Sequence, residues 1–169
     1  MIKTPRMVLD EIRQFITVHF FFNFNSFGQD LLGESIRKIG DKKTSVYMDK
    51  GIFHKAGPKK PGNLKAIRHS YSPKQGMERI VFDFAEAESP RIYGHFSTQQ
   101  KKISLDLFNT DLAQSIASFG SSHFVEGVNF LSVSKDSLSV ELHLRPQVTM
   151  DVFSLSSPGR LVIDLRSSH

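Results

Sequence analysis

Apolar and polar residues alternate in short runs from Ile67 to His169, and turn residues separate the runs. A period of two is typical of strands that bury one face of an antiparallel sheet. The pattern therefore predicts a β domain over residues 67–169. The clearest strands are expected at 79–84 (RIVFDF), 102–107 (KISLDL), 138–144 (LSVELHL) and 160–165 (RLVIDL), and weaker ones at 67–71, 91–96, 125–133 and 148–155.

The expected strands fall into two sets of four with the same order and similar gaps. Residues 80–84 align with 140–144 at an offset of 60, and Leu107 aligns with Leu165 at an offset of 58. Such self-similarity indicates an internal duplication. The two halves, 67–109 and 121–166, predict a β-sandwich of two small sheets packed face to face.

Helical spacing of apolar residues occurs in two other places. In residues 1–40 it predicts a helical extension, either one broken helix or a helical hairpin, that ends at Gly40. Between the two halves, Leu112, Ile116 and Phe119 have helical spacing, so a short helix or turn is expected over 110–120. The predicted fold class is mainly β with an N-terminal helical extension.

An apolar run at residues 15–24 could contact a membrane. A transmembrane helix needs about 20 apolar residues, and His19 interrupts this shorter run, so we expect no transmembrane span. Lys3 and Arg6 precede the run, as basic residues do in a secretory signal peptide. Three interpretations remain open: an atypical signal or anchor, an amphipathic helix packed on the domain, or a start codon misplaced upstream of a lost or atypical signal.

The positive charge is unevenly distributed. The chain has 22 Lys and Arg and 17 Asp and Glu, a formal net charge of +5. Residues 1–66 hold twelve basic and six acidic side chains, a net of +6, whereas residues 67–169 hold ten and eleven, a net of −1. Most of the excess lies in residues 41–66, where lysines among Gly and Pro predict a linker. Because a linker carries the charge, we expect no nucleic-acid partner.

The sequence shows no spacing typical of a catalytic or metal site. It has no cysteine, which excludes disulfide frameworks, thiolate zinc sites and cysteine nucleophiles. Its seven histidines form no H-E-x-x-H or other short ligand motif, and no G-x-S-x-G, phosphate loop or dinucleotide motif is present. We therefore expect no enzyme activity, no metal and no cofactor.

Three of the expected strands carry a base and, four residues later, an aspartate on the face opposite the core. If such strands are antiparallel neighbours, the base of one lies near the acid of the other and a cross-strand ion pair forms. The same side chains could bind a polar ligand, because guanidinium groups bind carboxylates with two hydrogen bonds. The candidate contacts are Arg79, Asp83, Arg160 and Asp164.

The order of motifs along the chain resembles a known family. ERIVFDF is followed by Pro90 and the aromatic run 92–96 (IYGHF), by KISLDLFNT and by the predicted helical link. A strand at 125–128 (VEGV), LSVELHLRPQVTMDVFSL and PGRLVIDLR complete the frame. The whole resembles the AMIN domain of periplasmic N-acetylmuramoyl-L-alanine amidases and type IV pilus secretins, and the resemblance covers residues 67–168.

The resemblance implies a non-catalytic β-sandwich of two related sheets that binds peptidoglycan and localises a partner activity to the cell wall. It places the protein in the periplasm or cell envelope of a Gram-negative bacterium. To the four candidate contacts we add Tyr93, as a side chain that stacks on a sugar. The alternative is a protein-interaction module of a pilus, secretion or division complex, which docks an envelope protein through an open sheet edge or the N-terminal aromatic segment.

Overall fold

In the computed structural model, the described part of the unit Ser35–His169 is mainly β. Among the described residues no helix is long and apolar enough to cross a membrane. The predictions for residues 1–35, including those for the apolar run, lie outside the described part. The structure describes residues 36–39, 45–113, 116, 119–134, 137–145 and 147–168.

Twelve strands lie in this described part of the chain. They are β1 (Arg37–Ile39), β2 (Val46–Met48), β3 (Gly51–Lys55), β4 (Gly62–Ser72), β5 (Met77–Phe84), β6 (Ile92–Ser97), β7 (Lys102–Phe108), β8 (Thr110–Leu112), β9 (Val125–Ser134), β10 (Ser137–Leu144), β11 (Val148–Leu155) and β12 (Arg160–Ser167). All eight strands expected from the alternating pattern are present, as β4 to β7 and β9 to β12.

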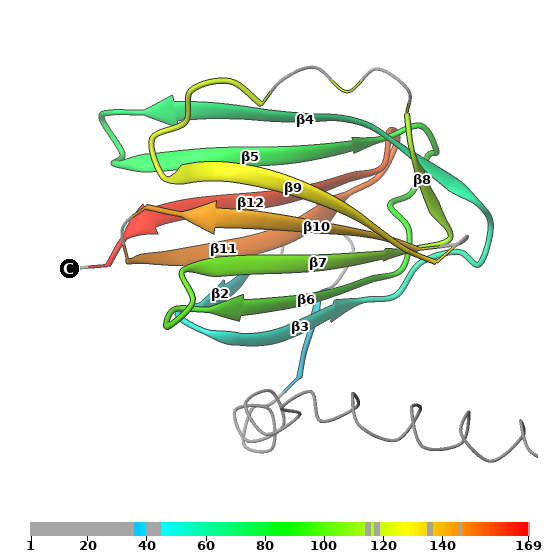
Figure 1. Ribbon diagram of the computed structural model, residues 1–169, viewed down its shortest axis with the longest axis horizontal. Helices are drawn as coiled ribbons and strands as arrows, with labels where there is room; N and C mark the ends of the chain where they lie inside the picture. Colours follow the sequence, from blue (N-terminus) through cyan, green and yellow to red (C-terminus); the bar gives the residue numbers. More distant parts are fainter. Residues whose placement is uncertain are drawn as a thin grey trace, which may run out of the picture. The chain divides into compact units, whose positions relative to one another are not determined.

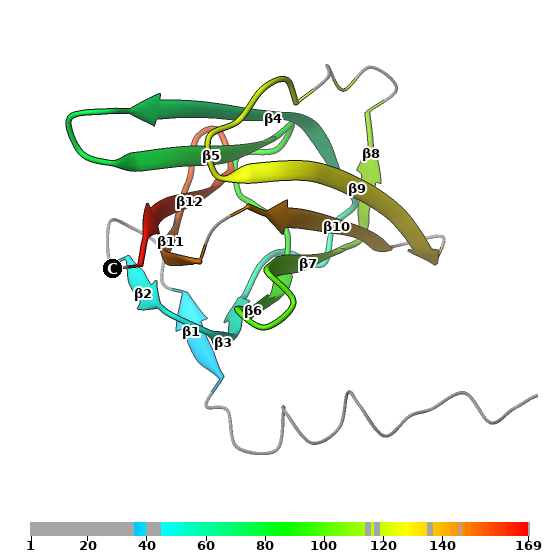
Figure 2. The ribbon, with the colours of Figure 1, turned by 60° about the vertical axis from the view of Figure 1, so that its left-hand side comes forward.

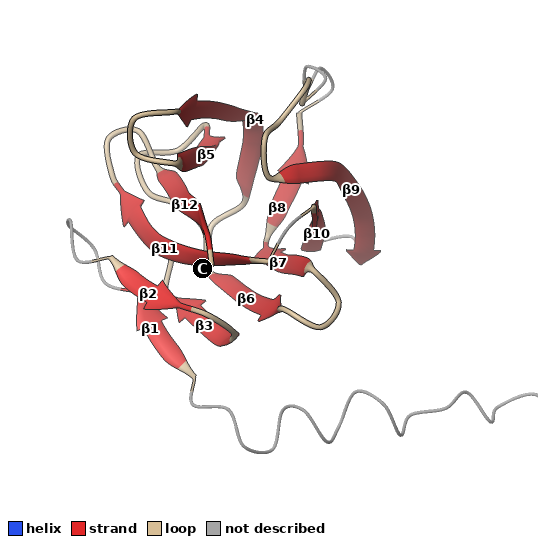
Figure 3. Cartoon of the chain, turned by 90° about the vertical axis from the view of Figure 1, so that its left-hand side faces the viewer, coloured by secondary structure: helices blue, strands red, loops and turns tan. Residues whose placement is uncertain are grey.

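The strands form two six-stranded sheets in a sandwich-like arrangement (Figure 1). Sheet A has the order β1-β3-β6-β7-β10-β9, and sheet B has the order β2-β11-β12-β5-β4-β8. The pairs β1–β3 and β4–β8 are parallel, and the other ladders are antiparallel. Figure 3 looks along the strands and shows the two layers.

The core lies between the two sheets, where large apolar side chains of alternate residues meet. Each fully buried side chain of this size contributes about 1.5 to 3 kcal/mol. The faces predicted to be inside are inside in all three base-x-x-x-Asp strands, and their nine apolar residues are at most 2% exposed. They are Ile80, Phe82 and Phe84 of β5, Ile103, Leu105 and Leu107 of β7, and Leu161, Ile163 and Leu165 of β12.

The two halves occupy equivalent places in the sandwich. Each half gives one hairpin to each sheet, so β4–β5 and β11–β12 meet in sheet B, and β9–β10 and β6–β7 meet in sheet A. The offsets of 60 and 58 from the sequence also relate the two central ladders: Ile80 pairs with Ile163, and Val140 pairs with Leu105. Strand order and register therefore repeat between the halves.

An irregularity in the ladders repeats as well. In sheet B the register shifts where Leu64 and Ala66 pair with Phe84 and Asp83. In sheet A it shifts at the equivalent place, where Val125 and Gly127 pair with Leu144 and His143. Each shift leaves one extra residue on the outer strand, the arrangement of a β-bulge, which bends a strand locally.

The linker prediction for residues 41–66 is wrong in the part that the structure describes. Residues 45–66 include β2, β3 and the start of β4; β2 pairs with β11 and β3 pairs with β6, at equivalent positions in the two sheets. Glycine serves close packing here: a Cβ at Gly57 would overlap the backbone of Pro90. Lys55 is buried, and its Nζ donates to Ala56 O at 2.7 Å. Sheet pairing thus overrides a composition typical of linkers.

Two helix predictions are also corrected. The end of the predicted extension 1–40 forms β1, because Arg37–Ile39 pairs with β3. The start of the predicted helix 110–120 forms β8, which pairs with the first residues of β4. No described residue of 110–120 is helical; Ile116 and Phe119 still pack on the core, but Leu112 is exposed. Backbone pairing with a neighbouring strand outweighs weak helical spacing in both segments.

Candidate ligand-binding face

Four of the five predicted contacts lie side by side on the outer face of sheet B. Arg79 and Asp83 project from β5, and Arg160 and Asp164 project from the neighbouring strand β12. In this ladder Arg79 is the partner of Asp164, and Asp83 is the partner of Arg160. Side-chain alternation explains the placement, because the intervening residues fill the core. The expected juxtaposition of bases and acids is confirmed for these two strands.

Arg79 and Asp164 form a two-pronged ion pair. Arg79 Nε and Nη2 donate to the two carboxylate oxygens of Asp164, each at 2.7 Å. The Asp164 side chain is 7% exposed, whereas that of Arg79 is 45% exposed and its guanidinium lies 5.7 Å from the Phe153 ring centroid. The hydrogen bond to Asp164 raises the pKa of Arg79. The contribution of this ion pair to folding stability is therefore fully present below the usual arginine pKa, and it is lost as the pH rises through the raised pKa.

Asp83 is held by a residue that the sequence did not single out. Arg68 on β4 donates from Nε and Nη2 to the two oxygens of Asp83, at 2.5 and 2.8 Å. This hydrogen bonding raises the pKa of Arg68. The sequence did offer a signal for this role. Residues 67–71 were expected to form a strand, and if Ile67 faces the core, alternation places Arg68 on the outer face.

Arg160 is therefore left without its cross-strand aspartate. Its Nε atom is buried and has no hydrogen-bond partner in the structure. A buried donor without a partner is costly, so the Arg160 side chain must move before this nitrogen can donate to a ligand. Arg160 is the predicted arginine contact whose guanidinium no described aspartate holds in place.

A third arginine–aspartate pair extends this surface. Arg166 Nη1 donates to Asp151, and Arg166 Nη2 lies 3.4 Å from Met77 Sδ. We call the combined surface the arginine face. It comprises Arg68, Arg79, Arg160 and Arg166, with Asp83, Asp151 and Asp164.

A hollow of about 520 Å³ borders the arginine face near Arg166. Tyr47, which is 60% exposed, lies at this hollow and is the cross-strand partner of Asp151. Polar side chains complete its lining: Gln75, Thr149, Ser167 and Ser168. An exposed aromatic ring beside a guanidinium offers both an apolar surface and a charged donor. Sequence reasoning missed Tyr47 because residues 41–66 were expected to be a linker.

The structure separates Tyr93 from the other predicted contacts. Tyr93 lies on β6 of sheet A, where its cross-strand partners are His54 and Asp106. Its side chain is on the outer face of that sheet, whereas the other four are on the outer face of sheet B. One small ligand therefore cannot contact all five residues.

The third base-x-x-x-Asp strand makes a different contact from the one expected. On β7, Lys102 Nζ donates to Glu141 of β10 at 2.7 Å. Asp106 has Tyr93 and Ser139 as cross-strand partners and makes no ion pair with a described residue. The expected base–aspartate pair is thus absent from the described part of sheet A.

Glu78 is a fully buried carboxylate that the sequence did not indicate. Its oxygens accept hydrogen bonds from His69 Nδ1 and Ser122 Oγ, each at 2.9 Å. They also accept from the backbone N–H of His123 at 3.2 Å and of Phe124 at 2.7 Å. Glu78 therefore fixes the segment that enters β9. Glu78 comes directly before RIVFDF, on the side of the strand that is otherwise apolar, and a single carboxylate there gave no signal of this role.

The His69–Glu78–Ser122 cluster contains residue types found in hydrolases, but its hydrogen bonds are directed differently. The Ser122 hydroxyl donates to Glu78 and accepts from the Val125 N–H at 2.9 Å. A serine nucleophile instead gives its proton to a histidine base. The cluster therefore acts as a structural clasp. Among the described residues, no group of three or more His, Cys, Asp or Glu could hold a metal ion.

The arginine face, the hollow that Tyr47 lines and the buried clasp are three polar features of the described unit. No protein-family model and no curated protein matches this chain.

Proposed function

We propose that this β unit is a non-catalytic AMIN-like module that binds peptidoglycan in the cell envelope of a Gram-negative bacterium and localises a partner activity to the cell wall. The observation that carries the proposal is the equivalence of the two sheets. The AMIN resemblance implies two related sheets, and here each half contributes one hairpin to each sheet at equivalent registers. This order supports an internal duplication over residues 67–168.

The arginine face suits the chemistry of peptidoglycan. Stem peptides carry carboxylates, and glycan strands carry hydroxyl and acetamide groups that accept hydrogen bonds. Asp83, Asp151 and Asp164 each bind one arginine, so those three guanidinium groups are held in fixed orientations. Arg160 supplies the unpaired donor. We therefore assign the main carboxylate contact to Arg160.

Tyr47 takes the role that the sequence assigned to Tyr93. It is exposed beside the hollow that Arg166 also lines, so a sugar ring could stack on its aromatic face while a carboxylate lies near the guanidinium. Tyr47 lies outside the residues that resemble AMIN. This part of the site would therefore be a property of the present chain.

Co-sedimentation of the full chain with purified sacculi at low salt tests the proposal. We expect the wild-type chain to pellet with sacculi and Arg160→Ala to bind about tenfold more weakly, because it loses a charge-assisted hydrogen bond. The matched control is Arg145→Ala, which removes the same charge from an exposed position after β10. Thermal unfolding should be similar for both variants.

Two results would contradict the proposal. A wild-type chain that stays in the supernatant at low salt does not bind peptidoglycan. If Arg145→Ala weakens binding as much as Arg160→Ala, the attraction is due to net charge and not to the arginine face.

A further inference from the structure

β9 is a long edge strand, and among the described strands it pairs only with β10. Sheets A and B have four edges, formed by β1, β2, β8 and β9 in the described part of the chain. Three of these strands have three residues each, whereas β9 has ten. An edge strand presents a row of free backbone N–H and C=O groups that can pair with another strand.

The second half of β9 lacks most of the features that usually prevent such pairing. Val128–Ser134 (VNFLSVS) contains neither a charged residue nor a proline. Leu131 and Val133 are 49% and 67% exposed. Natural edge strands are commonly protected by lysine, proline, shortness or a β-bulge. This segment has a register shift only at its end, between Ser132 and Ser134, and has none of the other three features.

The equivalent strand of the other sheet is partly covered. The outer edge of β4 pairs with β8 at Gly62–Leu64, and Ala113 N donates to Leu64 O at 3.1 Å. Further along β4, the side chain of Phe119 packs on that of His69, and His123 stacks on Tyr71. Among the described residues, segments of the chain thus pack along β4, whereas β9 has no second neighbouring strand.

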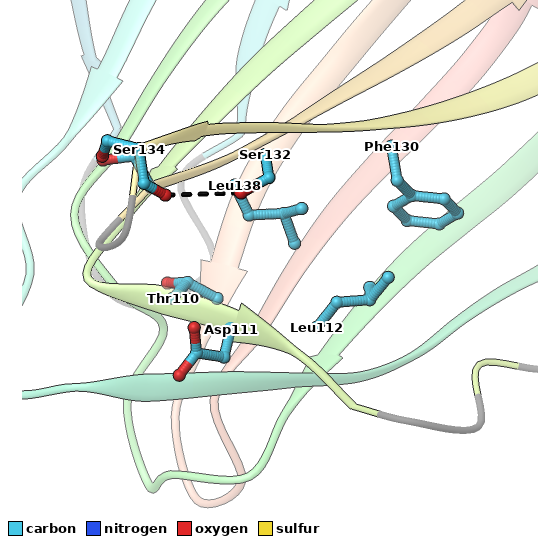
Figure 4. Close-up of a pocket in the computed structure, with 8 residues that line it drawn as sticks. Thr110, Asp111, Leu112, Phe130, Ser132, Ser134 and Leu138 are labelled. Carbon is cyan, nitrogen blue, oxygen red and sulfur yellow. Dashed lines mark hydrogen bonds between the residues drawn. The ribbon is translucent and has the colours of Figure 1, made fainter.

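β8 lies beside the end of the β9–β10 hairpin (Figure 2), and residues of β8, β9 and β10 line a hollow of about 270 Å³. Leu112, Phe130 and Leu138 form its apolar lining, and the Ser132 hydroxyl donates to Ser134 O at 3.4 Å on its β9 side (Figure 4). A strand added to β9 would direct every second side chain toward this hollow. The edge and the hollow would therefore bind the same strand.

We propose that the occupant is a second copy of this chain, paired antiparallel through β9 in a two-fold symmetric dimer. A two-fold axis brings one surface against itself, so the surface must be self-complementary. Val128–Ser134 meets this condition because it has no charge to repel its own copy. Pairing centred on Leu131 would place Phe130 of one copy opposite Ser132 of the other, a large side chain against a small one.

The same pairing covers the exposed apolar side chains. Around a two-fold axis at Leu131, the two Leu131 side chains lie opposite each other. The Phe130 side chain of the second copy points toward the hollow that Leu112 and Leu138 line. Apolar surface that is exposed in one chain thus becomes buried in the dimer, which favours association.

Disulfide trapping tests the proposed pairing, because the chain contains no native cysteine. Under oxidation, Leu131→Cys should form a covalent dimer, since residues opposite each other in an antiparallel pair have Cα atoms within disulfide reach, about 4.4 to 6.8 Å. The control is Ser70→Cys, at the exposed position of β4 that is equivalent to Leu131. The two positions are equivalent because Ser70 pairs with Arg79, Leu131 pairs with Ser139, and Arg79 and Ser139 are related by the offset of 60. We expect Ser70→Cys to remain largely monomeric.

Sedimentation equilibrium of the full chain measures the association directly. We expect a concentration-dependent dimer, and Leu131→Lys should raise its dissociation constant by at least about tenfold, because like charges lie opposite each other in the pair. Ser70→Lys should leave the constant unchanged. A wild-type chain that is monomeric at all concentrations would overturn the proposal. A dimer that Leu131→Lys does not weaken and Leu131→Cys does not trap would also overturn it. Circular dichroism checks that the two lysine variants fold. If a lysine variant does not fold, the comparison of Leu131→Cys with Ser70→Cys still tests the contact.

Discussion

The outer faces of sheets A and B differ although the sheets share strand order and register. In sheet B three aspartates each bind an arginine. In sheet A the equivalent positions hold mostly uncharged or smaller groups, and the lysine of the set binds a glutamate. The pairs of equivalent residues, sheet B first, are Arg68 and Asn129, Arg79 and Ser139, Asp83 and His143, Arg160 and Lys102, and Asp164 and Asp106.

This difference separates the requirements of the fold from those of a site. Most inner positions keep large apolar residues in both halves, as the buried side chains of β5, β7 and β12 show. The outer positions have changed without altering strand order or register. Exposed ion pairs usually contribute only about 0 to 1 kcal/mol to stability. Apart from the pair of the nearly buried Asp164, the ion pairs of the arginine face are therefore expected to add little to stability.

The inner faces also differ at some equivalent positions. Glu78 on β5 corresponds to Leu138 on β10, so a buried carboxylate in one sheet replaces an apolar side chain in the other. Gly94 on β6 corresponds to Val152 on β11. Replacing each residue by its counterpart would remove the difference between the sheets at that position and should lower the free energy of unfolding.

The largest effect is expected for Glu78→Leu, which gives β5 the residue found at the equivalent position of β10. Without the carboxylate, the Ser122 hydroxyl and the backbone N–H groups of His123 and Phe124 lose their acceptor. Leaving these groups unsatisfied should lower the free energy of unfolding by at least about 3 kcal/mol. Denaturant unfolding measures the loss.

Glu126→Leu is the control for this change, because Glu126 is exposed on β9 and makes no ion pair with a described residue. It should alter the free energy of unfolding by less than about 0.5 kcal/mol. Equal effects of the two variants would contradict the role of Glu78 as a clasp.

A second change tests how β3 packs on β6 in sheet A, compared with β2 on β11 in sheet B. Phe53 of β3 packs on Gly94 in sheet A, whereas Val46 of β2 is the partner of Val152 in sheet B. A Cβ at Gly94 would overlap the buried Phe53 ring. Gly94→Val should therefore lower the free energy of unfolding by about 2 to 3 kcal/mol, as overpacking does.

The double variant Phe53→Val with Gly94→Val reproduces the pair of sheet B. We expect it to be at least about 1 kcal/mol more stable than the sum of the single effects predicts, because the two side chains compensate each other. Denaturant unfolding of all four combinations gives this coupling. Additive effects would show that β3 on β6 and β2 on β11 do not pack in equivalent ways.

The sequence predicts the parts of this fold that depend on local alternation. RIVFDF, KISLDL and RLVIDL showed which side chains face the core, and the offsets of 60 and 58 relate the registers of the two central ladders. What the sequence could not show depends on pairing between distant segments. Strands β1, β2 and β8 have three residues each, too few for a period to appear, and they form because a neighbouring strand offers its edge.

The candidate site shows the same limit. Alternation placed Arg79, Asp83, Arg160 and Asp164 on one kind of face, and the structure brings them together. It could not show that Arg68 binds Asp83 and leaves Arg160 unpaired, because that depends on which strand lies beside β5. Tyr93 was added to them as a side chain that stacks on a sugar, and the sequence does not show that its strand belongs to the other sheet.

The smallest of these effects is expected for Asp164→Asn, compared with Asp106→Asn at the equivalent position of sheet A. Asp164 is nearly buried and accepts two hydrogen bonds from Arg79, whereas Asp106 makes no ion pair with a described residue. Losing the charge of Asp164 should lower the free energy of unfolding by about 1.5 kcal/mol, near the lower value for hydrogen bonds to charged groups because Arg79 is half exposed. Asp106→Asn should change it by less than about 0.5 kcal/mol. Unfolding in denaturant at low and high salt measures both, and salt should reduce the effect of Asp164→Asn only in part, since burial limits screening. If the two variants lose equal stability, the ion pairs of sheet B are no more structural than the single carboxylate of sheet A, and the arginine face is held together by its backbone alone.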